Sequence, residues 1–223
     1  MPALRRALPV LVALACLFTE GGAWSAERNK PGAVDYYVLV LSWVPSYCRR
    51  EGRDKKDKQC EAPQPHAFRL HGLWPQYDKG WPEDCAAAKR PWVPARVIEE
   101  MRGIMPSKNL IIHEYRVHGT CSGLDPAQYF GVARQLYERV SVPQRLLTPD
   151  ADRLVSPEEI EREFLGANPW LKPEMISVTC RRANLLDIRV CFGRDLFPRA
   201  CGVNEDQKRL CPAGKITIPP VTP

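Results

Sequence analysis

Histidine is scarce in this sequence, which has four among 223 residues. Its nine cysteines include no Cys-x-x-Cys pair. Because a zinc ribbon needs two such pairs, the cysteines are not expected to bind metal. Internal repeats and low-complexity segments are also absent. The length and the 44% hydrophobic content indicate one sizeable core and a single domain.

A membrane-spanning segment is not evident near the N-terminus. The apolar run at 7–18 is shorter than the roughly 18 to 20 residues that cross a bilayer. Two arginines precede the run and small residues follow it, an order typical of a secretory signal peptide. We therefore expect residues 1–25 to be cleaved, leaving 26–223 as the mature domain. An uncleaved anchor or a lipoprotein site at Cys16 are the alternatives.

The cysteines that remain after cleavage are eight in number. An even number in an exported chain predicts up to four disulfides, with 105 pairings open. The net charge is +6, and loss of the two Arg and one Glu of the signal peptide leaves +5. This modest excess is compatible with a polyanionic partner but does not identify one.

Strands are expected at both ends of the mature chain, with helices between them. Apolar or alternating segments predict strands at 35–43, 66–74, 175–180, 185–192 and 215–218, and start and stop signals predict helices over 95–105, over 110–118, from Asp125 and from Ser156 to Gly166. Such an order predicts an α+β fold with a central, mainly antiparallel sheet and helices grouped on it.

A charged loop at 49–58 carries six basic and three acidic residues between two cysteines. One interpretation is a flap that attracts phosphate. The other is a solvated hairpin closed by a disulfide, which the composition favours.

Two of the four histidines lie in the string His113 to Cys121, which is His-Glu-Tyr-Arg-Val-His-Gly-Thr-Cys. Glu114 and His118 are four residues apart and share a helix face, where a carboxylate orients an imidazole and favours its protonated form. His113 and His118 are five apart, which places them about 140° apart around a helix. They are poor co-ligands for zinc, so the string predicts acid/base chemistry rather than a metal site.

A third histidine, His71, begins His-Gly-Leu-Trp-Pro-Gln. An isolated histidine is more often structural than catalytic, but here Gly72 permits close approach and the face of Trp74 can stack on a base. This context makes His71 a candidate for the site.

The two strings, in this order and tens of residues apart, resemble the two active-site motifs of the ribonuclease T2 family, secreted endoribonucleases found from bacteria to plants and animals. The first strand up to Cys48 and the segment from Leu186 to Phe192 resemble the family framework as well. The resemblance thus covers nearly the whole mature chain and suggests a bacterial-type member.

The resemblance implies a role for each matching residue. His118 matches the general base that deprotonates the ribose 2′-OH, and His71 matches the general acid that protonates the leaving 5′-oxygen. His113 matches the phosphate-binding histidine, and Glu114 the acidic residue that supports the phosphorane. Single-stranded RNA would be cut with low base specificity to 2′,3′-cyclic phosphate ends, without a metal or another cofactor.

Several positions depart from the family pattern or concern substrate binding. Val117 replaces the lysine that usually precedes the second histidine, and Arg116 is the nearest candidate to compensate. Two changes are milder. Tyr115 stands where a Trp is usual, and Gln76 stands where an acidic or amide residue often helps to recognise a base. Trp74, Tyr77 and Trp81 are candidates for stacking on bases. The alternative is that they pack the loop, which the pattern favours for Tyr77 and Trp81.

The resemblance also implies the disulfides Cys85–Cys121, Cys180–Cys211 and Cys191–Cys201, and leaves Cys48–Cys60. The sequence therefore predicts a secreted or periplasmic endoribonuclease, expected to be a monomer. Two alternatives stay open: a non-catalytic or weakly active RNA-binding or storage relative of the same fold, and a secreted metal-dependent hydrolase.

Overall fold

The computed structural model describes residues 29–52, 57–60, 67–85 and 91–221, with only the backbone of Gly52 and Lys58. The signal peptide predicted for residues 1–25 lies outside these ranges. No helix within them is long and apolar enough to cross a membrane.

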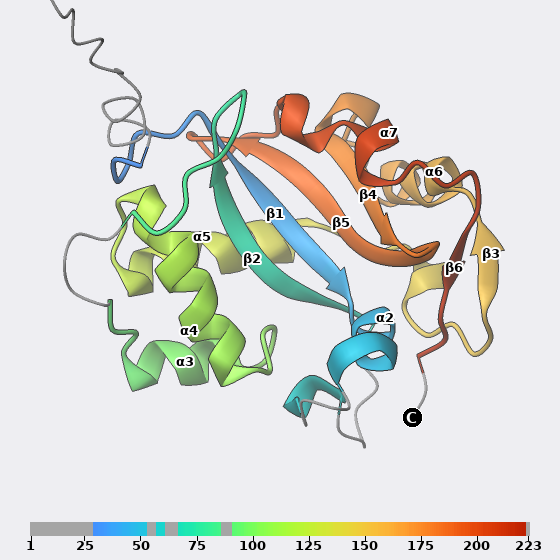
Figure 1. The fold of residues 1–223 in the computed structure, drawn as a ribbon, viewed down its shortest axis with the longest axis horizontal. Coiled ribbons are helices and arrows are strands. Elements are labelled where there is room, and N and C mark those ends of the chain that lie inside the picture. The colour runs from blue at the N-terminus through green and yellow to red at the C-terminus, as the bar shows by residue number, and fades with distance from the viewer. Residues whose placement is uncertain (1–28, 53–56, 61–66, 86–90, 222–223) are drawn as a thin grey trace, which may run out of the picture.

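A six-stranded sheet in the order β2-β1-β5-β6-β3 runs through the molecule, and β4 also pairs with β5 (Figure 1). The strands are β1 (Tyr36–Trp43), β2 (Phe68–Gln76), β3 (Arg153–Val155), β4 (Ile176–Arg181), β5 (Asn184–Gly193) and β6 (Ile216–Ile218). Each pairing is antiparallel except the short contact of β5 with β6. The predicted α+β class and the mainly antiparallel sheet are confirmed.

Helices α3, α4 and α5 gather beside β2, and α6 lies near β4 (Figure 1). The helices are α2 (Val44–Tyr47), α3 (Ala95–Met101), α4 (Lys108–Val117), α5 (Pro126–Arg139), α6 (Pro157–Ala167) and α7 (Gln207–Leu210). Capping boxes formed by Asp125 with Gln128 and by Ser156 with Glu159 begin α5 and α6 where the sequence predicts. Helix α4 starts before the predicted Leu110, because the side chain of Ser107 caps it.

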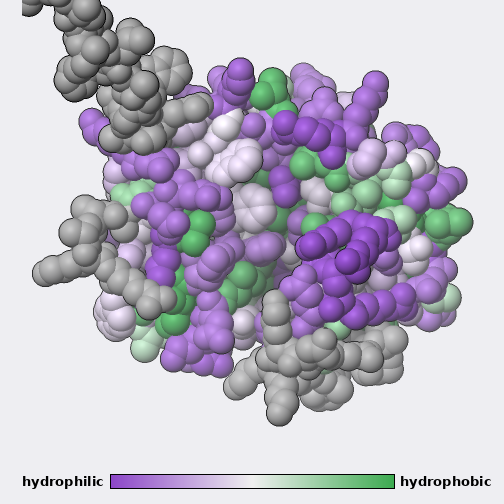
Figure 2. Space-filling view, viewed as in Figure 1, coloured by the Kyte–Doolittle hydropathy of each residue, from purple (hydrophilic) through white to green (hydrophobic). Residues whose placement is uncertain are grey.

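The two faces of the sheet differ in composition. Leu39 and Leu41 of β1 point into the main core with the apolar side chains of α5 and α6, whereas Val38 and Val40 belong to a small cluster on the other face. Ser42 follows on that second face. In Figure 2, hydrophilic residues border the part of the surface that lies over β1 and β2. The second face is therefore where polar chemistry can lie against a rigid sheet.

Strand β2 lies at the edge of the sheet, and α5 covers part of that edge. The hydroxyl of Tyr129 donates to the carbonyl of Leu73 at 2.8 Å and accepts from its N–H at 3.3 Å. Pro75 fits within β2 because an edge strand does not need every N–H for the ladder. The edge strand is thus held in place without a further strand.

The charged loop at 49–58 lies partly outside the described residues, so the choice between a flap and a hairpin stays open. A π-helical turn (Cys48–Gly52) and a 3₁₀ turn (Lys58–Cys60) are described on either side of 53–56, and 61–66 also lie outside the description. Arg49 forms an ion pair with Asp152 at 2.9 Å. The sequence did not predict β3, α2 and α7, which have three or four residues each.

Four disulfides join the elements: Cys48–Cys60, Cys85–Cys121, Cys180–Cys211 and Cys191–Cys201. Three of them are the pairs that the family resemblance implies, and Cys48–Cys60 is the pair that it leaves. Cys85–Cys121 links the loop after β2 to the 3₁₀ turn that follows α4, so it fastens the two histidine strings to each other.

Candidate active site

A β-bulge in β2 positions His71. Val40 of β1 pairs with Gly72, and the next residue, Leu41, pairs with Leu70, so His71 is the extra residue. Bulges bend a strand and redirect a side chain. The bulge places the His71 ring on the second face of the sheet, in front of β5.

Both ring nitrogens of His71 have polar partners. Nδ1 lies 3.0 Å from Oγ of Ser42 and 3.9 Å from a carboxylate oxygen of Asp187, and Nε2 lies 3.4 Å from Oε1 of Glu114. Glu114 is 1% exposed and Asp187 is 3% exposed. One imidazole therefore lies between two buried carboxylates.

These carboxylates set the charge of His71. Burial by itself lowers the pKa of His71, but Glu114 and Asp187 outweigh burial and raise this pKa from 6.5 to about 10. Burial likewise acts to raise the pKa of Glu114, but the attraction of His71 brings it below 4.5. At neutral pH the pair is an imidazolium beside a carboxylate.

Gly72 allows Glu114 to reach the sheet. A Cβ at Gly72 would collide with the Glu114 carboxylate, so a glycine is required for the close approach of α4 to β2. The second oxygen of Glu114 accepts a hydrogen bond from the indole N–H of Trp74 at 2.8 Å. Glu114 thus joins His71 to Trp74.

His118 follows α4 as its C-cap and stacks on Trp74. The two rings are 5.1 Å apart with an interplanar angle of 30°. Nδ1 of His118 is buried and has no hydrogen-bond partner in the described part of the chain. Burial, with repulsion from His71, lowers the pKa of His118 below 6.5 although Glu114 opposes the shift. His118 is therefore neutral under conditions where His71 is charged.

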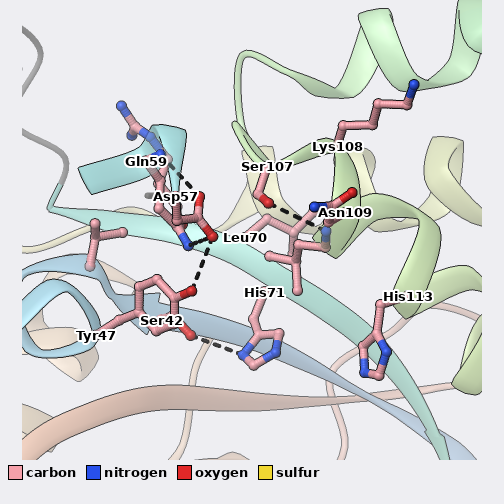
Figure 3. A pocket seen from close by; sticks show the side chains of 13 residues that line it. Ser42, Tyr47, Asp57, Gln59, Leu70, His71, Ser107, Lys108, Asn109 and His113 are labelled. Carbon is pink, nitrogen blue, oxygen red and sulfur yellow. Dashed lines mark hydrogen bonds between the residues drawn. The ribbon is translucent and has the colours of Figure 1, made fainter. Parts of the chain in front are cut away.

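Two cavities lie at this cluster. The His71 cavity, of about 540 Å³, is lined by Ser42, Val44, Tyr47, Asp57, Gln59, Arg69, Leu70, His71, Ser107, Lys108, Asn109, Leu110 and His113. Figure 3 shows the rings of His71 and His113 facing the same space from β2 and α4. The Trp74 cavity, of about 450 Å³, is lined by Trp74, Gln76, Trp81, Glu83, His118, Arg189, Asn204, Glu205, Arg209 and Leu210. Residues of this one cluster therefore line two cavities, with His71 at the first and Trp74 and His118 at the second.

Comparison with known proteins gives a family match over most of the chain. The family model described as "Ribonuclease T2 family" matches residues 34–201. The chain belongs to the ribonuclease T2 family. A ribonuclease of Aeromonas hydrophila is 37% identical over 119 residues, which are 53% of this chain and 52% of that protein. A probable ribonuclease of Haemophilus influenzae is 28% identical over 179 residues, or 75% of this chain and 61% of that protein.

The chain spans between half and two thirds of the length of these two bacterial relatives. Among solved structures, an RNase-related protein from Calystegia sepium superposes with a TM-score of 0.65 at 20% identity, over 85% of this chain and 98% of that one. This likeness supports the ribonuclease T2 fold.

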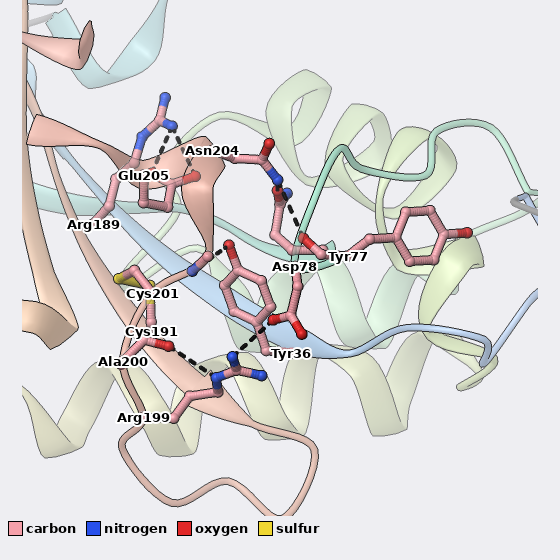
Figure 4. Close-up of a disulfide and its surroundings, with 12 residues drawn as sticks. Tyr36, Tyr77, Asp78, Arg189, Cys191, Arg199, Ala200, Cys201, Asn204 and Glu205 are labelled. Carbon is pink, nitrogen blue, oxygen red and sulfur yellow. Dashed lines mark hydrogen bonds and ion pairs between the residues drawn. A yellow bond between two sulfur atoms is a disulfide. The ribbon is translucent and has the colours of Figure 1, made fainter.

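Within the described residues, Arg116 does not take the place of the usual family lysine. Val117 is half-buried, and the side chain of Arg116 donates to the carbonyl of Pro91 at 3.2 Å. Arg116 lines neither the His71 cavity nor the Trp74 cavity. The cation beside Trp74 is Arg189, whose guanidinium lies 4.9 Å from the ring centroid and pairs with Glu205 at 3.0 Å (Figure 4).

Only some of the aromatic residues that are candidates for base stacking in this ribonuclease T2 member line a cavity of the site. Trp74 and Trp81 line the Trp74 cavity, and Gln76 lines it as well. Tyr77 lines neither cavity, and its ring points away from Arg189 in Figure 4. Tyr115, 7% exposed, belongs to the core. Trp81 therefore fits a base-stacking role better than Tyr77.

Two polar residues at the site were not singled out from the sequence. Ser42 donates to Oδ1 of Asp187 at 2.5 Å while lying beside His71. Asp187 is buried within β5, at 3% exposure. The sequence did offer one signal for Ser42, because a serine is unusual within an otherwise apolar and aromatic strand. Its partner Asp187 could not be inferred, because only the pairing of β1 with β5 brings the two residues together.

Proposed function

We propose that this protein is an endoribonuclease that cuts single-stranded RNA by transphosphorylation, leaving 2′,3′-cyclic phosphate ends, without a metal ion. The observation that supports this proposal most strongly is the pair of histidines on one buried carboxylate, with one pKa raised and the other lowered. Two titratable groups whose environments separate their pKa values are suited to acid and base roles at one pH.

We assign His118 as the general base and His71 as the general acid. Neutral His118 accepts the proton of the 2′-OH, the 2′-oxygen attacks phosphorus, and the bond from phosphorus to the 5′-oxygen breaks. His71 delivers its proton to that oxygen. The cyclic phosphate and a free 5′-OH result, and no other reactant is consumed. Each positioned proton transfer commonly contributes roughly a hundred- to ten-thousand-fold.

Glu114 and His113 take supporting roles in this proposal. Because the lowered pKa of Glu114 keeps it ionised, it supports the phosphorane by holding the His71 imidazolium and the indole of Trp74. His113 is exposed on α4 and shares the cavity of His71, where it would contact phosphate. Trp74 and Trp81 would contact bases, with low selectivity because every base has a stacking face.

The expected location of the protein follows from the N-terminal segment. We propose that residues 1–25 are removed and that 26–223 act as a monomeric, secreted or periplasmic domain. The four disulfides are typical of an oxidising compartment.

A weakly active RNA-binding relative is the second candidate, because Val117 replaces the usual lysine. The metal-dependent alternative is less well supported, since the described residues include no group of three or more His, Cys, Asp or Glu side chains that could hold a metal ion.

Digestion of RNA by the refolded mature protein, with and without EDTA, tests the proposal. We expect RNA to be cut equally in both conditions, and DNA or RNA with 2′-deoxyribose at the cut site to stay intact. Cleavage of the 2′-deoxy substrate would rule out attack by the 2′-OH. Loss of activity in EDTA would favour the metal-dependent alternative, and binding without cleavage would favour the RNA-binding relative.

A further inference from the structure

A buried carboxylate lies behind His71, on the side away from Glu114. Asp187 of β5 accepts from the hydroxyl of Ser42 through Oδ1 and from that of Thr179 through Oδ2, at 2.5 and 3.3 Å. Its backbone N–H also donates to the Thr179 hydroxyl at 3.0 Å. An ionised carboxylate buried to this degree needs a cation or several donors. Within the described residues, the basic group in ion-pair range of Asp187 is His71.

Strand register brings these groups together. Ser42 of β1 pairs with Asp187 of β5, and Asp187 pairs with Thr179 of β4. On the other side of β1, the bulge in β2 turns His71 toward Ser42. Three strands therefore hold the carboxylate, the hydroxyl and the imidazole in one row.

The hydrogen bonds fix which atom of His71 carries a proton. The single proton of the Ser42 hydroxyl is donated to Asp187, so its oxygen is left to accept from Nδ1–H of His71 at 3.0 Å. Asp187 is too far from Nδ1, at 3.9 Å, for a direct hydrogen bond and acts on the ring through Ser42 and through its charge. A proton held on Nδ1 leaves Nε2 to exchange the other proton.

We propose that Ser42 and Asp187 are positioning residues that hold His71 with Nδ1 protonated, so that the proton on Nε2, which lies beside Glu114, is the one delivered to the leaving 5′-oxygen. This inference rests on the proposed ribonuclease function and adds two residues to it. Asp187 also keeps the imidazolium charged until the leaving group needs the proton, because burial alone would favour the neutral ring.

Several other charged or titratable groups face His71. From α4 and its C-cap come Glu114, His113 and His118; β5 contributes Asp187 and Arg189, and the His71 cavity contributes Asp57, Arg69 and Lys108. Replacing Asp187 by Asn removes one negative charge and leaves the other groups unchanged. The pKa of His71 should then fall, and the basic limb of the pH–rate profile should move to lower pH.

The test compares two substrates in wild type and Asp187→Asn. A dinucleoside phosphate has an alkoxide leaving group that needs a proton, whereas uridine 3′-(4-nitrophenyl phosphate) has a phenolate that leaves without one. We expect kcat for the dinucleoside phosphate to fall roughly ten- to a hundredfold with little change in KM. The basic limb should move down by about one pH unit, and the aryl ester should be cut at nearly the wild-type rate.

Matched variants separate this effect from folding. Asp150→Asn makes the same chemical change at an exposed position and should leave both substrates unaffected. Ser42→Ala removes the hydroxyl without removing a buried charge, and Ser42→Thr should restore much of the activity. If Asp187→Asn does not fold, Ser42→Ala decides the matter through the same ratio of the two substrates and through the ¹⁵N titration of His71.

Each outcome has one meaning. Equal losses on both substrates, or an unchanged pH profile in a folded variant, would overturn the positioning role while leaving the ribonuclease proposal intact. Wild-type protein that cuts neither substrate would overturn the proposed function itself.

Discussion

His71 and His118 both contact the indole of Trp74 but have contrasting surroundings. His71 has polar partners on both ring nitrogens and two buried carboxylates beside it. His118 has a stacked ring, an Nδ1 without a partner among the residues that the structure describes, and one carboxylate acting from a distance. Hydrogen bonds and negative charge favour the cation at His71, whereas burial favours the neutral form at His118. The comparison shows how two histidines that contact one indole come to have pKa values shifted in opposite directions.

Replacing either histidine should have the largest effect and should separate the two roles. We expect His71→Ala and His118→Ala each to lower kcat on RNA by roughly a hundred- to ten-thousand-fold. With uridine 3′-(4-nitrophenyl phosphate), the loss should persist in His118→Ala and largely vanish in His71→Ala. His113→Asn serves as the comparison and should raise KM more than it lowers kcat. Reversed behaviour of the two alanine variants would mean that the roles are exchanged.

Removing the shared carboxylate should make the two surroundings more alike. Glu114→Gln keeps the shape but removes the charge that raises the pKa of His71, so kcat should fall roughly ten- to a hundredfold. Gly72→Ala should give a similar loss, because its Cβ would displace the same carboxylate. Steady-state kinetics checks both, with the exposed Glu138→Gln as control. A wild-type rate for Glu114→Gln would contradict the role of this carboxylate.

The pH dependence of wild type should display the same contrast. Because the pKa of His118 is lowered, kcat/KM should be lost on acidification only below pH 6.5. Because the pKa of His71 is raised to about 10, kcat/KM should also be lost at the basic end, as the pH rises through about 10. His71 should also stabilise the fold fully below pH 6.5, and this contribution should disappear as the pH rises through about 10. Urea unfolding at several pH values measures this last effect, and stability that increases across that range would contradict it.

Val117→Lys should have the smallest effect and concerns the His118 side. A lysine at this position adds positive charge near the phosphorane, so we expect kcat on RNA to rise about threefold to tenfold. Val117→Met, of similar length and uncharged, controls for packing. No rise, with normal folding, would mean that the charge is already supplied elsewhere, for which Arg189 beside Trp74 is a candidate.

The sequence was most informative where signals are local. Capping residues at Asp125 and Ser156 marked the starts of two helices, and the apolar composition of 35–43 marked the central strand. The motif residues Glu114 and His118 are four apart and meet the same indole. Predicted boundaries failed where tertiary contacts decide them, as at the end of α3, where the last predicted turn is an irregular turn after Met101.

The site itself shows what strand pairing adds. The sequence determined which residues could do acid/base chemistry and, through the family resemblance, which roles to expect for His71, His113, Glu114 and His118. The tertiary structure decided that His71 lies on a bulge facing Ser42 and Asp187, that Arg116 turns to Pro91, and that Tyr77 lies outside both cavities. The physical reason is that pKa values and side-chain direction depend on groups distant in sequence, and register brings those groups together.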